Sequence, residues 1–123
     1  MKSTPFKVEV EIIENIAVIK LAASFHTSNR MAEDFRTCLT DLITKGFYNI
    51  IVNMGEVTSI DSEGLGLLTL GYKECLNNNG RFIMCELDNE DVIEVIEIVN
   101  LDKIIPICST QNEAILKIKY NLK

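Results

Sequence analysis

Basic residues are few in this sequence, and they form no cluster. Twelve lysines and arginines stand against eighteen aspartates and glutamates, so the formal net charge is −6. A protein that binds nucleic acid needs a concentrated basic surface to neutralise phosphates. We therefore expect no nucleic-acid partner, whereas the acidity suits a basic protein partner.

Candidate metal ligands are also scarce. His26 is the only histidine, and no two of the four cysteines form a C-x-x-C pair. Zinc needs a tighter set of ligands than this, so we expect no metal site. The cysteines are expected to be free, buried thiols in a reducing cytoplasm. They are Cys38, Cys75, Cys85 and Cys108.

Long apolar runs are absent as well. No stretch reaches the ~18 apolar residues that a membrane-spanning helix needs. Residues 1–5 lead directly into a charged, alternating segment, without the apolar core of a signal peptide. These absences predict a cytoplasmic protein without a membrane-bound segment.

The strands are predicted by alternating and by continuous apolar patterns. Residues 6–13 alternate between apolar and charged, which is typical of a half-buried strand. A tight turn at 14–15 leads to a second strand at 16–23, which is apolar on both faces and expected inside the sheet. The expected buried face of the first strand carries Phe6, Val8, Val10 and Ile12. Further buried strands are expected at 47–52, 81–85 and 104–108, with a loop at 53–61.

Apolar residues at helical spacing predict four helices. The first follows cap candidates at 27–29 and ends at Gly46, and the second spans 62–79. The third runs from 88 to 100, where β-branched residues make a strand the close alternative. The fourth begins at the capping box Thr110-x-x-Glu113. The expected core positions are Met31, Phe35, Leu39, Leu42 and Ile43 in the first helix, Leu65, Leu68, Tyr72, Cys75 and Leu76 in the second, and Ala114, Ile115, Ile118 and Leu122 in the fourth.

The order ββαβαβαβα predicts an α/β fold. Strands that alternate with helices form βαβ units, so the sheet should be mostly parallel, with the opening hairpin as its antiparallel member. A chain of 123 residues can bury a core without disulfides or metals. We find no repeat or linker, so residues 1–123 are expected to form one domain with about four helices.

The third predicted helix has more apolar surface than one sheet needs. Pairs of apolar residues recur along it, and part of them is expected to form a contact face. These residues are Val92, Ile93, Val95, Ile96, Ile98 and Val99.

The most informative segment is Asp61-Ser62-Glu63-Gly64-Leu65-Gly66, at the start of the second predicted helix. Each of its two glycines costs about 1 kcal/mol in a helix relative to alanine. Close packing against the sheet would offset this cost, and so would a bare backbone that a partner or an anion approaches. The simpler interpretation is that Asp61 or Ser62 serves only as a helix N-cap.

This segment and its setting resemble the STAS family, the fold of bacterial anti-sigma factor antagonists. The other matching positions are Tyr72-Lys73, Gly80, the apolar strand 82–85 and Leu101-x-x-Ile104, so the resemblance covers the whole chain as one STAS domain. It implies that the serine after the aspartate, Ser62, is the phosphorylation site and that its neighbours contact the partner. The implied partner-binding residues are Thr58, Ser59, Ile60, Asp61, Glu63, Gly64, Leu65 and Gly66.

Two positions depart from the family pattern. Glu63 stands where family members usually carry a serine or threonine, and it places a permanent negative charge beside Ser62. His26 stands where an acidic residue often ends the second strand, and the resemblance implies that it lies near the Ser62 loop. A histidine there can change its charge near neutral pH, although a plain loop residue is the simpler interpretation.

The resemblance also implies a mode of action. Such antagonists bind an anti-sigma factor that is a serine kinase, which then phosphorylates them, and a PP2C-type phosphatase reverses this step. The nucleotide belongs to the kinase, so no cofactor is expected on this chain. We expect a monomer or weak dimer without nucleic-acid or membrane partners.

The rival functions have weaker support in the sequence. Ser62 is not in a G-x-S-x-G motif, and no G-x-x-x-x-G-K-[ST] occurs, so an enzyme or nucleotide-binding function is not expected. A phospho-acceptor role for Asp61 would need an acidic pair after the first strand to hold Mg²⁺, and none is present there. The main alternative is a STAS scaffold or regulatory module in a larger signalling assembly, without direct control of a sigma factor.

Overall fold

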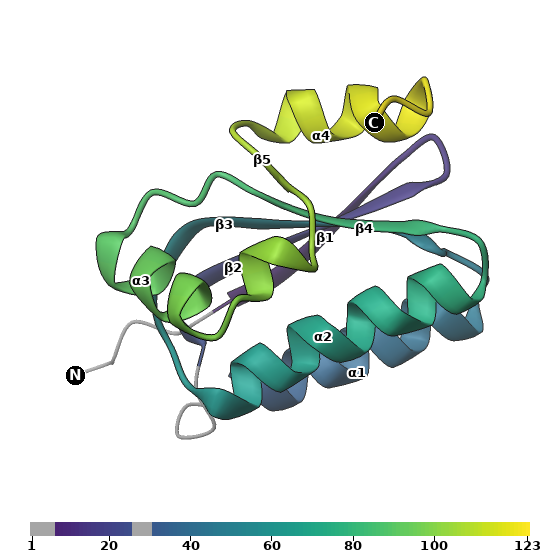
Figure 1. Ribbon diagram of the computed structural model, residues 1–123. Coiled ribbons are helices and arrows are strands. Elements are labelled where there is room, and N and C mark those ends of the chain that lie inside the picture. Colours follow the sequence, from purple (N-terminus) through teal and green to yellow (C-terminus); the bar gives the residue numbers. More distant parts are fainter. Residues whose placement is uncertain (1–6, 26–30) are drawn as a thin grey trace.

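The computed structural model describes residues 7–25 and 31–123, which form a five-stranded mixed sheet with four α-helices (Figure 1). The predicted order of elements is confirmed, including the helical state of the third helix. The strands are β1 (Lys7–Ile13), β2 (Ile16–Phe25), β3 (Asn49–Ile60), β4 (Arg81–Cys85) and β5 (Ile107–Cys108). The helices are α1 (Met31–Thr44), α2 (Ser62–Asn77), α3 (Glu90–Ile98) and α4 (Gln111–Lys119), and a 3-10 turn, η2 (Leu101–Lys103), follows α3.

The strand order is β1-β2-β3-β4-β5, so every strand lies beside its neighbour in the chain. β1 is antiparallel to β2 across the expected turn, where Glu14 has a positive φ of 51°. The remaining pairs are parallel, and β2 is an interior strand as predicted. The carboxyl ends of β2 and β3 therefore meet, with Phe25 paired to Ile60, and α2 starts directly after this point.

The two faces of the sheet are covered unequally. Figure 1 shows α1 and α2 side by side beneath the sheet and α4 above it. The larger core lies between the sheet and α1, α2 and α3, with Phe35, Leu68 and Phe82 completely buried in it. A smaller core lies under α4 and includes Ile51, Ile83 and Ala114. The first turns of α2 therefore belong to the layer with the larger core.

The prediction of a loop at 53–61 is wrong, because β3 continues to Ile60. β2 also runs further than predicted, to Phe25, and the two strands stay paired up to their ends. The pairing shifts register twice, once near Gly55, whose N–H donates to Asn53 Oδ1 at 2.9 Å, and once at Thr58. Each shift leaves one extra residue on β3 and locally interrupts the ladder, and the pairing with β2 resumes beyond it.

The fifth strand is shorter than the predicted 104–108. The N–H groups of Ile104 and Ile105 both donate to the carbonyl of Leu101, so these residues close the 3-10 turn. Pro106 has no N–H to offer, although its carbonyl accepts from Met84. Only residues 107–108 are left to pair with β4 as strand.

Four residues that we placed in the core are exposed instead. Val10 and Ile12 are 44% and 48% exposed on β1, which is the edge strand, whereas Val8 on the same strand packs against the larger core. Leu76 is 46% exposed on the last turn of α2, and Leu122 lies beyond the end of α4. Phe6 and the cap candidates at 27–29 lie outside the described residues.

Candidate functional site

Ser62 is the first residue of α2 and is exposed. Asp61 just before it has extended backbone angles, and its Oδ1 accepts from the N–H of Gly64 at 3.0 Å. Asp61 is therefore the N-cap, which confirms one of the two cap candidates. Because the aspartate makes the cap, the Ser62 hydroxyl stands at the positive end of the helix dipole without serving as the capping group.

The residues around Ser62 divide into exposed and buried groups. Thr58 and Gly66 are exposed and Ser59 and Leu65 are half-buried, so their side chains or backbone lie at the surface. Ile60 is only 7% exposed and belongs to the larger core. Gly64 is buried too. A partner could contact the exposed residues directly. Ile60 and Gly64 are buried beneath this surface and could not be contacted in the same way.

Gly66 of the motif and Gly71, about one and a half turns later on α2, have different surroundings. A methyl group added to Gly66 would meet no atom within 4 Å, so packing against the sheet does not explain this glycine. Its bare backbone faces open space instead. Gly71, further along α2, is the glycine that packs closely, since a Cβ there would lie 2.5 Å from the ring of Phe82.

The negative charge of Glu63 is met by a cation from the neighbouring helix. Arg36 on α1 places Nη2 3.3 Å from Glu63 Oε2. Both side chains are partly exposed, so the pair contributes little to stability. It nevertheless places a guanidinium beside Glu63, the residue that follows Ser62 in the chain. No pattern in the sequence indicates Arg36, because it lies 27 positions before Glu63 and only the packing of α1 against α2 brings the two together.

His26 lies outside the described residues, so its expected place near Ser62 stays a prediction.

The cysteines are free, and three of them are buried. Burial raises the pKa of Cys75 and Cys85 to about 12, with smaller contributions from Glu74 and Glu86 respectively. Within residues 7–25 and 31–123, no three His, Cys, Asp or Glu side chains are grouped so that they could hold a metal ion. Cys38 on α1 is the half-buried one, and burial together with Asp41 raises its pKa to about 11.

Cys38 is expected to react slowly with alkylating reagents at neutral pH. A thiol with a pKa of about 11 in place of 9.0 carries roughly 100-fold less thiolate near pH 7–8, and its thiolate rises about tenfold per pH unit up to pH 10. Mass spectrometry after timed iodoacetamide treatment between pH 7 and 10 measures this rate, with glutathione as the reference. A rate that levels off near pH 9 would contradict the assignment.

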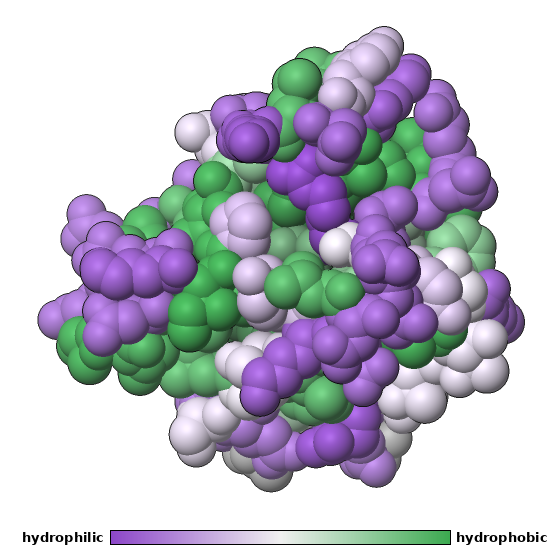
Figure 2. All heavy atoms as spheres, turned by 45° about the vertical axis from the view of Figure 1, so that its right-hand side comes forward, coloured by the Kyte–Doolittle hydropathy of each residue, from purple (hydrophilic) through white to green (hydrophobic). Residues whose placement is uncertain are grey.

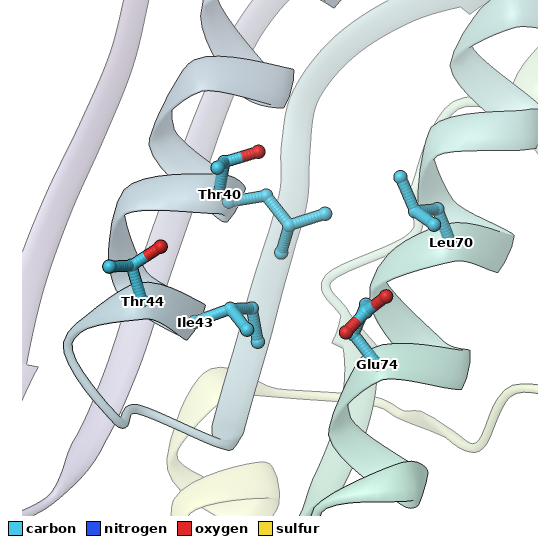
Figure 3. Close-up of a pocket in the computed structure, with 6 residues that line it drawn as sticks. Thr40, Ile43, Thr44, Leu70 and Glu74 are labelled. Atoms are coloured by element: carbon cyan, nitrogen blue, oxygen red, sulfur yellow. The ribbon is translucent and has the colours of Figure 1, made fainter.

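The pocket between α1 and α2 does not coincide with Ser62. It has a volume of about 190 Å³, and Figure 3 shows Ile43 of α1 and Leu70 and Glu74 of α2 facing the space between the helices. Leu70 is eight residues beyond Ser62, which is about 12 Å along the helix axis. Its polar lining consists of the hydroxyls of Thr40 and Thr44 and the carboxylate of Glu74.

Comparison with known proteins identifies the family. The STAS domain model matches residues 7–114. The chain belongs to the STAS-domain family. An anti-sigma factor antagonist homologue from Thermotoga neapolitana is 28% identical over 110 residues, which are 89% of this chain and 95% of the relative.

Solved STAS structures have the same architecture. The crystal structure of an anti-sigma factor antagonist from Thermotoga maritima superimposes with a TM-score of 0.83 at 26% identity, covering 91% of this chain and 94% of the other. The Bacillus cell-fate determinant SpoIIAA in its phosphorylated form gives a TM-score of 0.69 at 24% identity, covering 92% and 98%. Among the described residues, none of the helices of this STAS chain is both long and apolar enough to cross a bilayer.

Proposed function

We propose that this STAS protein is an anti-sigma factor antagonist that binds an anti-sigma factor with serine kinase activity and is released when Ser62 is phosphorylated. The observation that carries the proposal is the exposed serine at the start of α2, directly after the capping aspartate of a D-S-E-G-L-G motif. The anti-sigma factor antagonists among its relatives support the class of partner. The protein acts by binding, in the cytoplasm, and needs no cofactor of its own.

The physical basis of the switch is local charge. Unmodified Ser62 is small and neutral and can be covered by a partner at little cost. A phosphate adds about −1.5 to −2 charges at pH 7, on a residue that stands between Asp61 and Glu63 in the sequence. A partner that buries this position must then desolvate a concentrated negative charge. Release therefore requires no change of fold.

Arg36 explains how a glutamate can stand beside the phosphorylation site. A lone carboxylate at position 63 would resemble part of the charge that phosphorylation adds. The guanidinium 3.3 Å away offsets it and leaves the surface around Ser62 less negative than the sequence implies. Glu63 is therefore compatible with binding in the unmodified state.

The proposal predicts that the phosphate goes to Ser62 alone. The intact protein is incubated with ATP and with each candidate anti-sigma serine kinase from the source genome, and peptide mass spectrometry maps the modification. We expect one phosphate per chain, on the peptide that contains Ser62, because its hydroxyl is exposed and free of the cap.

The Ser62→Ala protein is the control and should take up no phosphate. Ser59 lies on the same peptide and is half-buried, so fragment spectra must separate the two serines. A PP2C-type phosphatase should restore the original mass. Phosphate on Ser59, or equal incorporation into the Ser62→Ala protein, contradicts the proposed site.

A further inference from the structure

The segment from Asp88 to Ile104 concentrates the negative charge of the protein. It contains six acidic residues and a single basic one, Lys103, while the net charge of the whole chain is −6. Four of the acids lie on α3 and are exposed. None of these four makes an ion pair with any residue in the described part of the chain. They are Glu90, Asp91, Glu94 and Glu97.

Exposed apolar side chains lie in the same segment. Val92 and Ile96 bury one side of α3 in the core, whereas Ile98 is 70% and Val99 48% exposed at the end of the helix. Ile104, which follows the η2 turn packed against α3, is 50% exposed. Figure 2 shows hydrophobic groups gathered left of centre, in the region of α3 and the turn after it. We call Ile98, Val99, Ile104, Glu94 and Glu97 the α3 surface.

The α3 surface is not explained by the fold. The core is closed by the other side of the helix, so Ile98 and Val99, which are largely exposed, contribute little burial to the folding of this chain. Of the six residues predicted to include a contact face, Ile98 and Val99 are exposed. The structure adds Ile104, which was not among the six. The α3 surface lies on a different element from Ser62, which is the first residue of α2.

We propose that the α3 surface docks a basic amphipathic segment of a protein partner. Its charge excludes the other common occupants: a second copy would bring the same carboxylates face to face, and nucleic acids and anionic membranes would be repelled. A helix that carries leucines on one side and lysines beside them meets both properties of the surface. Its apolar side chains cover Ile98, Val99 and Ile104, and its ammonium groups pair with Glu94 and Glu97.

A synthetic helix of leucine and lysine is the probe. Its binding to the intact, isotope-labelled protein is followed by amide chemical shifts and by the dissociation constant at 50 and 200 mM salt. We expect the shifts to centre on residues 90–104 and the affinity to fall as salt rises. Replacing Ile98→Ser should weaken binding about tenfold through lost apolar contact, and Glu97→Lys by a similar factor at low salt.

The controls separate this surface from general acidity. Glu11→Lys on β1 makes the same change in net charge at an exposed position and should leave binding unchanged. A serine–lysine peptide of equal charge should bind at least tenfold more weakly than the leucine–lysine helix. Thermal melts of each variant check that the fold is intact. Because Ile98 is largely exposed, its replacement by serine should leave the melting temperature nearly unchanged.

Several results would overturn the proposal. These are shifts that spread evenly over all acidic residues, equal affinity for both peptides, or an equal loss in Glu11→Lys and Glu97→Lys. A concentration-dependent dimer that Ile98→Ser abolishes would assign the surface to a second copy. Binding to vesicles with anionic lipids that the same variant abolishes would assign it to a membrane. None of these measurements involves Ser62, so the phosphorylation proposal stands or fails separately.

Discussion

Phosphorylation of Ser62 is expected to weaken binding of the anti-sigma partner several-hundred-fold. A phosphate that the partner must bury beside Asp61 and Glu63 loses hydration and is repelled by both carboxylates. A cost of ~3–4 kcal/mol follows, and each 1.4 kcal/mol is a factor of ten in affinity. The Arg36 guanidinium reduces the repulsion from Glu63 but leaves the desolvation cost in place.

The dissociation constant measured by titration calorimetry checks this prediction. The unmodified protein and Ser62→Ala should bind with similar affinity, and the phosphorylated protein and Ser62→Asp should bind weakly. Ser109→Asp places the same charge on an exposed serine before α4, on the other side of the sheet, and should bind like the unmodified protein. Equal affinity of Ser62→Ala and Ser62→Asp would remove the switch.

The phosphorylated protein should keep its fold. Ser62 lies at the N-terminus of a helix, where negative charge is favourable, and the Asp61 cap does not involve the serine side chain. The melting temperature of the phosphorylated form should therefore stay within a few degrees of the unmodified one. A large drop would mean that affinity is lost through unfolding instead of charge at the interface.

The order of elements could be predicted because its signals are local. Strand and helix periodicity, the cap at Asp61 and the stop at Gly46, whose φ is +92°, each depend on a few neighbouring residues. The extension of β3 to Ile60 could not be predicted, since it follows from pairing with β2 beyond the irregularity at Gly55. The polar residues after Val52 gave only the pattern of a loop.

The same distinction holds for the candidate site. The exposed position of Ser62 follows from its place after the cap of a predicted helix. The pairing of Arg36 with Glu63 depends on how α1 lies against α2, which no short pattern encodes. The burial of Ile60 likewise follows from the unexpected end of β3, which brings this residue into the core. Local chemistry was thus predictable, and contacts between distant elements were not.

Gly80→Ala is expected to destabilise the protein by about 3 kcal/mol. A Cβ at this position would lie 1.8 Å from the carbonyl oxygen of Tyr48, so the backbone itself would have to move. The same carbonyl accepts from the N–H of Arg81 at 3.1 Å, and the N–H of Gly80 donates to Cys75 at 2.7 Å. Relieving the clash therefore strains the junction between α2 and β4, and overpacking of this kind costs about 1–3 kcal/mol or more.

Gly66→Ala is the matched control for this effect. The substitution is the same, but the new methyl group meets no atom within 4 Å, and alanine favours the helix by about 1 kcal/mol. Thermal or urea unfolding should therefore give opposite signs, with Gly80→Ala less stable and Gly66→Ala equal to or more stable than the parent. Two variants of equal stability would show that the α2–β4 junction yields easily, and that Gly80 is not required by close approach of the backbone to Tyr48.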